Sequence, residues 1–198
     1  MAQLSVILAH PRHGSFNHAI VATAVQTLKA QGHEVWFHDL YQENFDPVLH
    51  PAELEREAYL PPGLAEHCRE IAQAQGIIIV HPNWWGQPPA ILKGWVDRVF
   101  RPEVAYRFQE GAGGAGVRVG LLQAKAAMVF TTSNTPPDRE LTVFGDPLKT
   151  LWENCIFGLW GVRQFYGRNF AVVVTSTAAQ RQAWLEEVRE MVGIFCPT

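Results

Sequence analysis

The sequence predicts an α/β protein in which helices cover both faces of a parallel sheet. Short β-branched runs alternate along the chain with longer segments whose apolar residues recur at helical spacing. Residues 4–9 and 76–80 are apolar almost throughout, as are strands that are buried on both faces. Such alternation favours parallel strands that are joined by crossover helices.

Five runs have the composition of strands, because β-branched, aromatic or other apolar residues dominate them. They lie at residues 4–9, 34–38, 76–80, 126–131 and 170–175. Pro82 follows the third run and cannot extend it, since proline has no amide hydrogen to donate to a neighbouring strand. The expected arrangement is a flavodoxin-like three-layer sandwich with strand order 2-1-3-4-5, formed by residues 1–198 as one domain.

The helices are expected between these strands. They follow the loop at residues 10–17 as far as residue 29, and occupy residues 64–75, 91–100, 147–159 and 178–192. Gly32 ends the first helix, and Pro88 and Pro89 stand where the third can begin. The segment 39–60 carries Pro47 and Pro51 and is expected to be irregular, as is the connection at residues 101–123.

Composition excludes several classes of protein. A net charge of −3 without clusters of Lys or Arg gives no electrostatic footprint for nucleic acid or for anchoring to a membrane surface. No apolar run approaches the roughly 20 residues of a membrane span, so no insertion is expected. Cys68, Cys155 and Cys196 are odd in number and match no metal or disulfide spacing. Free thiols and the absence of a signal-like start indicate a cytoplasmic protein.

Three polar or aromatic loops follow predicted strands at their carboxyl ends, where open α/β sheets bind ligands. Residues 82–86 carry two tryptophans that offer a flat apolar wall. Residues 10–17 open a helix whose N-terminal N–H groups can bind phosphate, with Ser15 and Asn17 as caps or anion ligands. Residues 131–134 supply hydroxyl and amide groups. The sequence therefore predicts one ligand site at this edge of the sheet.

Other patterns in the chain do not support a site. The glycines of residues 111–116 match GxGxxG, but they neither follow a strand nor open a helix, so a mobile surface loop is expected. His10, His13 and His81 end neighbouring strands, yet no Cys, Asp or Glu nearby completes a metal site, and none is predicted. There is no GxSxG motif and no catalytic cysteine signature.

Several short motifs then support one another. The most specific is Pro82-Asn83-Trp84-Trp85, followed by Pro89 to Trp95 and Asp97 to Phe100. Supporting pieces are His10 with Ser15-Phe16-Asn17, Asp39-Leu-Tyr, Asn44 to Pro47, and Ala105-Tyr106. Together they resemble the flavodoxin-fold NAD(P)H:quinone oxidoreductases (the DT-diaphorase family), which include small bacterial members and ancillary flavoproteins of potassium-efflux systems.

The resemblance implies a homodimer that binds flavin noncovalently and passes a hydride from NAD(P)H through it to a quinone-like acceptor. It assigns the phosphate end of the flavin to His10, Ser15, Phe16 and Asn17, the isoalloxazine ring to Pro82, Asn83, Trp84, Trp85 and Gly86, and its pyrimidine side to Thr131, Thr132, Ser133 and Asn134. Tyr106 and Phe108 would form a wall of the substrate pocket, within one subunit or across the dimer.

The chain departs from that family in two places. Family members often have Thr-Thr-Gly-Gly, whereas in this chain Ser133 and Asn134 follow the two threonines. Mammalian members also place a Tyr and a His beside the flavin, and this chain has no counterpart of either residue. FMN is therefore expected, with FAD as the alternative, and no catalytic side chain is assigned. A redox-sensing subunit of an ion-transport system and a flavodoxin-type electron carrier are alternative functions.

Overall fold

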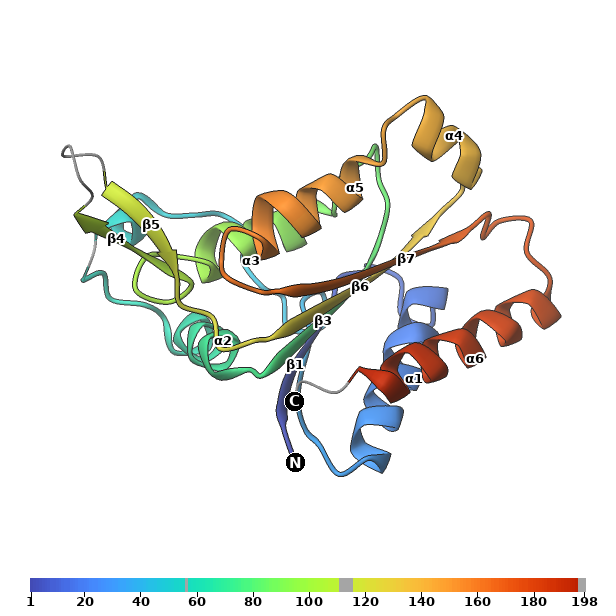
Figure 1. Ribbon diagram of the computed structural model, residues 1–198, viewed down its shortest axis with the longest axis horizontal. Helices are drawn as coiled ribbons and strands as arrows, with labels where there is room; N and C mark the ends of the chain where they lie inside the picture. The colour runs from blue at the N-terminus through green and yellow to red at the C-terminus, as the bar shows by residue number, and fades with distance from the viewer. Residues whose placement is uncertain (56, 111–115, 196–198) are drawn as a thin grey trace.

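Five parallel strands form the central sheet (Figure 1). The computed structural model describes residues 1–55, 57–110 and 116–195. The strand order is β2-β1-β3-β6-β7, which confirms the predicted order because β4 and β5 form a separate hairpin. The strands of the sheet are β1 (Gln3–Leu8), β2 (Glu34–Asp39), β3 (Gly76–Pro82), β6 (Ala126–Ser133) and β7 (Gln164–Ala171).

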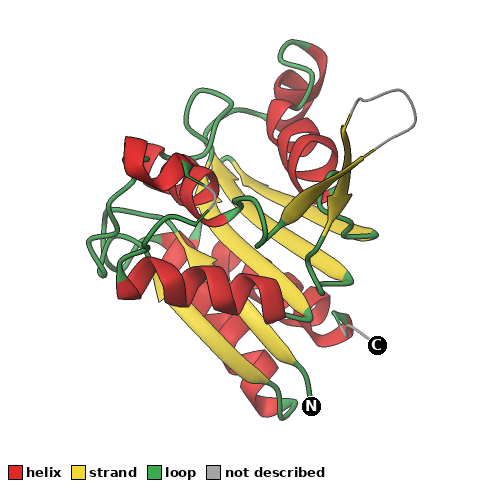
Figure 2. Ribbon diagram, turned by 90° about the vertical axis from the view of Figure 1, so that its left-hand side faces the viewer, coloured by secondary structure: helices red, strands yellow, loops and turns green. Residues whose placement is uncertain are grey.

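Helices cover both faces of the sheet, as predicted (Figures 1 and 2). On one face lie α1 (Phe16–Ala30) and α6 (Ala178–Ile194), which contact each other. On the other lie α2 (Pro62–Gln73), α3 (Ala90–Val99), and α5 (Pro147–Lys149) with the π-helix Thr150–Phe157 that continues it. Two short helices, Pro51–Leu54 and α4 (Pro137–Thr142), lie outside these layers.

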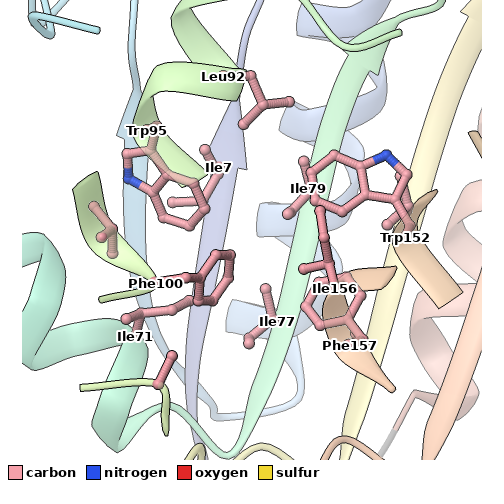
Figure 3. Close-up of a cluster of buried hydrophobic side chains, with 14 of the residues drawn as sticks. Ile7, Ile71, Ile77, Ile79, Leu92, Trp95, Phe100, Trp152, Ile156 and Phe157 are labelled. Carbon is pink, nitrogen blue, oxygen red and sulfur yellow. The ribbon is translucent and has the colours of Figure 1, made fainter. Parts of the chain in front are cut away.

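The centre of the sheet is buried on both sides. All residues of β3 are buried, and its alternating side chains enter two separate cores. Ile77 and Ile79 face the core that Figure 3 shows, among Trp95, Phe100 and Trp152. Each such aliphatic side chain contributes about 1.5–3 kcal/mol when it is fully buried. The continuous apolar run that predicted this strand is thus explained by helices on both faces.

In the segment 39–60, the described residues form one short helix, Pro51–Leu54, and the segment is held against α3. The Arg98 guanidinium donates to both carboxylate oxygens of Glu53 at 2.9 and 2.5 Å, and both side chains are buried. Gly94 lets α3 approach this segment, because a Cβ there would lie 2.1 Å from the carbonyl oxygen of Pro47. The irregular segment is therefore fixed against the helix that follows β3.

Two expected segments differ in the structure. The connection at residues 101–123 was expected to be irregular but contains an antiparallel hairpin of β4 (Tyr106–Glu110) and β5 (Gly116–Gly120). Residues 111–115, where a mobile loop is predicted, lie outside the described residues. The expected strand at 170–175 begins earlier, at Gln164, because pairing with β6 starts there. Its first half is polar because β7 is an edge strand with residues open to solvent.

The helix expected at residues 147–159 is present but mostly has π-helical rather than α-helical geometry, and α4 was not expected. Short apolar segments do not distinguish these geometries by periodicity. Cys68 is a buried free thiol and Cys155 an exposed one, whereas Cys196 lies outside the described residues. Among the helices of the described ranges, none has both the length and the apolar composition needed to cross a membrane.

Candidate functional site

A hollow of about 640 Å³ opens at the carboxyl edge of the sheet. The loops after β1, β3 and β6 form most of its wall, and a further side follows β7. Its lining residues are His10, Arg12, Gly14, Ser15, Phe16, Asn17, Pro82, Asn83, Trp84, Thr132, Ser133, Asn134, Val173, Val174 and Arg181. The three loops that the sequence singled out therefore meet in one place.

The N-terminus of α1 forms one end of this hollow. Ser15 is its N-cap residue, but its hydroxyl caps no backbone N–H of the first turn and instead lies 2.9 Å from the side-chain Nδ1 of His18. Within the described chain, the backbone N–H groups of Phe16 and Asn17 have no acceptor. Free N–H groups and the helix dipole favour an anion at this position.

Asn17 contributes an unpaired polar atom to the same end. Its side chain is only 2% exposed, and Nδ2 donates to Oγ1 of Thr132 at 2.9 Å. Its Oδ1 is buried and has no hydrogen-bond partner in the described structure. A buried, unpaired oxygen of this kind destabilises the fold unless a ligand donates to it. Oδ1 is thus suited to accept a hydrogen bond from a hydroxyl group of a ligand.

The loop after β3 forms the opposite, aromatic end. Trp84 and Gln87 exchange two backbone hydrogen bonds of 3.0 Å, and Trp85 and Gly86 between them have φ values of 58° and 72°. These are the positive φ values of a type I′ turn, which few residues other than Gly, Asn and Asp adopt easily. The turn directs Trp85 into solvent, where it is 100% exposed, while Trp84 lines the hollow and lies 6.4 Å from His10 between ring centroids.

Asn83 stabilises the conformation of this loop. Its Oδ1 accepts the N–H of Gly86 at 2.9 Å, and its Nδ2 donates to Glu140 of α4 at 2.9 Å. The backbone N–H of Asn83 donates to the carbonyl of Thr132 at 2.7 Å. These contacts join the loop after β3 to β6 and α4, so the aromatic wall has a defined position.

Cationic side chains lie at the hollow. Arg12 follows β1, and Arg181 belongs to the first turn of α6, where its Nη1 donates to the carbonyl and hydroxyl oxygens of Ser176 at 2.7 and 3.0 Å. Burial lowers the pKa of His10 and outweighs the opposing effect of its hydrogen bond to the carbonyl of Arg12. His10 is therefore neutral at pH 7, and the arginines supply the positive charge. A planar apolar ring with a hydroxylated, anionic tail matches these walls.

Ten of the thirteen predicted cofactor residues line this hollow. Trp85 and Gly86 do not, because Trp85 faces solvent and Gly86 packs toward Pro147. Thr131 lies instead on a different hollow with Asn169, whose Oδ1 accepts its hydroxyl at 3.2 Å.

Tyr106 and Phe108 lie on the hairpin and line another hollow, of about 410 Å³, beside Arg101 and Leu54. Within one chain, the structure therefore does not bring these two residues to the aromatic loop. Their predicted place on the wall of the substrate pocket stays a prediction, and it would require a second copy of the chain.

Sequence reasoning missed Val173, Val174 and Arg181. The rule that ligands bind at the carboxyl ends of strands also applies to the fifth strand, and it would have included the segment after β7. Arg181 carries no such local signal, because an arginine in the first turn of a helix is commonly only solvated.

His81 is unavailable as a metal ligand. Trp152 donates its indole N–H to Nε2 of His81 at 3.0 Å, so Nδ1 carries the ring proton and donates to the carbonyl of Pro82 at 2.8 Å. Burial lowers the pKa of His81 to about 4, which keeps the ring neutral. The ring orients the end of β3 and cannot join His10 and His13 around an ion.

A second histidine cluster lies away from this hollow. Glu43 faces Nδ1 of His38 at 2.8 Å and Nε2 of His67 at 3.2 Å, which are positions that could hold a metal ion. However, Trp95 donates to Nδ1 of His67 at 3.1 Å, so Nε2 carries the ring proton and has no lone pair for a metal. The cluster is therefore a network of hydrogen bonds and ion pairs.

The sequence is similar to those of known oxidoreductases. The chain is 36% identical over 137 residues to an uncharacterized NAD(P)H oxidoreductase of Haemophilus influenzae, covering 68% of this chain and 65% of the relative. It is 34% identical over 122 residues to NAD(P)H dehydrogenase [quinone] 1 of Cavia porcellus, covering 52% of this chain and 44% of that protein. The chain thus spans less than two thirds of the length of either relative.

The fold recurs in solved structures. The structure of NAD(P)H:quinone oxidoreductase from Methanothermobacter marburgensis superposes with a TM-score of 0.79 at 23% identity, and the match covers 97% of this chain and 96% of that one. A family model described as "Flavodoxin-like fold" matches residues 2–192, nearly the whole length. With its five-stranded parallel sheet and its hollow at the carboxyl edge, the chain belongs to the family of flavodoxin-like proteins.

Proposed function

We propose that this chain is a flavin-dependent NAD(P)H oxidoreductase that reduces a quinone-like acceptor by two electrons. The bound flavin would accept a hydride from NAD(P)H and transfer it to the acceptor. The observation that carries the proposal is the hollow with an anion-binding helix end on one side and Trp84 on the other. The names of the two relatives, an NAD(P)H oxidoreductase and an NAD(P)H dehydrogenase [quinone], support the same activity.

The polar end of the hollow fits the tail of a flavin. A ribityl hydroxyl would satisfy the unpaired Oδ1 of Asn17, and a phosphate would accept from the free N–H groups of Phe16 and Asn17. Arg12 and Arg181 would neutralise the phosphate charge. This end explains why a buried amide oxygen and an uncapped helix are retained in the fold.

The aromatic end fits the ring. Pro82 and Trp84 would form its apolar wall, and the hydroxyl and amide groups at residues 132–134 would face its polar edge. Since Asn83 fixes the loop to α4 and β6, little conformational freedom would be lost on binding. The side chains here orient the ring and exclude water from one side of it, and no side chain is assigned to proton transfer.

We infer FMN as the occupant, with FAD as the alternative. Ser133 accepts from Asn169 through its hydroxyl at 3.1 Å, and Asn134 accepts from the N–H of Val174 at 3.0 Å. These side chains join the ends of β6 and β7 and fill space in the hollow that two glycines would leave open. A smaller hollow is consistent with FMN, which is shorter than FAD.

A cytoplasmic homodimer is part of the same proposal. Phe108, Leu54 and Tyr59 are 60%, 72% and 85% exposed, and these apolar side chains near the hairpin and the segment 39–60 would be covered by a second copy of the chain. In such a dimer, Tyr106 and Phe108 could form a wall of the partner's pocket. NAD(P)H and the acceptor would use the same open face in turn, so ping-pong kinetics are expected.

The experiment is a spectrum of the purified protein, followed by chromatography of the released chromophore. A yellow protein that releases FMN, is bleached by anaerobic NADPH or NADH, and regains colour with a quinone is expected. A protein that takes up neither FMN nor FAD would contradict the proposal. Release of FAD alone would contradict only the choice of cofactor.

Neighbouring tryptophans provide a matched pair of variants. Trp84→Ala removes a wall of the hollow and should raise the Kd for flavin about tenfold or more. Trp85→Ala removes an equally large side chain that faces solvent, so it should change that Kd less. The Kd values are measured by quenching of flavin fluorescence, and equal effects of the two changes would show that the ring is misplaced.

A further inference from the structure

His18 stands behind the phosphate end of the hollow, in contact with two groups that define its protonation. Oδ1 of Asp39 accepts the N–H groups of Tyr41 and Gln42 at 3.1 and 3.2 Å, which orients the carboxylate at the end of β2. Its Oδ2 lies 3.3 Å from Nε2 of His18. A carboxylate only accepts hydrogen bonds, so Nε2 of His18 carries a proton.

The other ring nitrogen then sets the direction of the Ser15 hydroxyl. With the proton on Nε2, Nδ1 of a neutral His18 has a lone pair and accepts the O–H of Ser15 at 2.9 Å. The single hydroxyl proton of Ser15 is thus directed away from the hollow. This contact explains why the N-cap side chain of α1 makes no capping bond.

A phosphate at the helix end changes this arrangement. Phosphate oxygens accept hydrogen bonds, so Ser15 contributes a donor to a phosphate only if its proton leaves His18. Nδ1 of His18 would then lose its partner in a site that is only 17% exposed. A second proton, on Nδ1, removes the conflict, because imidazolium donates both to Asp39 and to the Ser15 oxygen.

We propose that His18 is a positioning residue that takes up one proton when the flavin phosphate binds, turning the Ser15 hydroxyl toward the phosphate. This inference rests on the flavin site proposed above and adds a proton to its binding equilibrium. The relay runs from Asp39 through His18 to Ser15. The imidazolium also adds a positive charge close to the phosphate.

The charged and titratable surroundings bear on this coupling. His13 and His10 lie 5.2 and 6.2 Å from His18 between ring centroids, and Arg12 and Arg181 line the same hollow. These groups oppose a further positive charge on His18, whereas Asp39 favours it. The negative charge of a bound phosphate would offset the repulsion from these cationic groups.

The sign of the pH dependence follows. Because the bound state holds a proton that the free state lacks, flavin affinity is greatest at low pH and falls as pH rises through neutrality. In the proton-coupled range, the Kd for FMN rises toward about tenfold per pH unit. Ionisation of the phosphate itself, near pH 6, acts in the opposite direction.

The experiment measures the Kd for FMN and for riboflavin between about pH 6 and pH 8 on the full chain freed of flavin. The wild type should show the loss of affinity with FMN but not with riboflavin, which has no phosphate. Calorimetric titration in two buffers of different ionisation enthalpy should show uptake approaching about one proton per FMN.

Two variants separate the relay from a purely structural role. Asp39→Asn keeps an oxygen for Tyr41 and Gln42 but presents an amide N–H to Nε2 of His18. Nδ1 then carries the ring proton and can donate to Ser15 without proton uptake, so FMN should bind with little dependence on pH. His18→Gln has no titratable group and should also lose the slope.

The outcomes are distinct. A wild-type protein that binds FMN tightly with no loss of affinity at higher pH would overturn the relay and leave the proposed function standing. The same slope in wild type and in either variant that folds would also overturn it. A protein that binds no flavin at any pH would overturn both proposals.

Discussion

His38 lies between two carboxylates, with Nδ1 2.8 Å from Glu43 and Nε2 2.6 Å from Glu70. Burial alone would lower its pKa, but the hydrogen bonds to Glu43 and Glu70 outweigh burial and raise it. Burial would likewise raise the pKa of Glu43, yet the bonds from His38 and His67 hold it at about 2. The charged network is complete above the unfolded pKa of Glu43 and below that of His38.

The expected consequence is a pH-dependent contribution of His38 to stability. Since its folded pKa is raised, His38→Gln should reduce the free energy of unfolding most below about pH 6.5, and the loss should shrink as pH rises through the folded pKa. Urea denaturation at several pH values measures it. His50→Gln, which removes an exposed partner of Asp46, serves as control. A loss for His38→Gln that is the same at all pH values would contradict the assignment.

At this scale, much of the site could be predicted, but not all. The residues after β1, β3 and β6 were found because strand ends can be recognised from composition. The sequence could not predict that Trp85 points into solvent. That direction depends on a positive φ at Trp85, a backbone conformation that is common for Gly and rare for Trp. The partners of His18 and His67 were also hidden, because Asp39 and Trp95 reach them from other elements.

At the scale of elements, the backbone of α3 approaches the segment 39–60 closely at Gly94. A Cβ at Gly94 would lie 2.1 Å from the carbonyl oxygen and 2.4 Å from the Cβ of Pro47. Both clashing atoms belong to backbone or to a rigid ring, so neither can move aside easily. Glycine is required here by space and not by φ.

Gly94→Ala should therefore destabilise the fold by about 1–3 kcal/mol or more through overpacking. Gly63→Ala in α2 is the matched control, because nothing lies within 4 Å of its Cβ position. That change should be neutral or stabilising by about 0.5 kcal/mol, since alanine favours the helix. The free energy of unfolding in urea compares the two, and equal losses would show that α3 can shift.

β3, which is buried on both faces, and α3, whose apolar residues recur at helical spacing, could be predicted well. The hairpin of β4 and β5 could not, because it lies outside the sheet and residues 106–109 of β4 are half-buried or exposed without an alternating apolar pattern. The predicted position of β7 was too late in the chain for a similar reason. As an edge strand, β7 carries polar residues, whereas the more apolar residues that follow it line the hollow.

For the whole molecule, the proposed cofactor should act as a stabilising ligand. It would contact loops after β1, β3, β6 and β7, so binding would link elements that are far apart in the chain. At a free FMN concentration of 100 Kd, the gain is about 2.7 kcal/mol, or roughly 5–10 °C in Tm for a chain of this size. A melting curve with and without FMN measures the gain. Riboflavin should give less, and an unchanged Tm at saturating FMN would contradict the site.

Arg181 and Val173 complete the hollow from the last part of the chain, beside residues that stand near its beginning. During translation, the loops after β1 and β3 leave the ribosome long before the first turn of α6 exists. A flavin could meet the early loops then, but not the full set of walls. If the proposed flavin binds here, its loading would be a late event in biosynthesis, and the loops after β1 and β3 would be made before the site is complete.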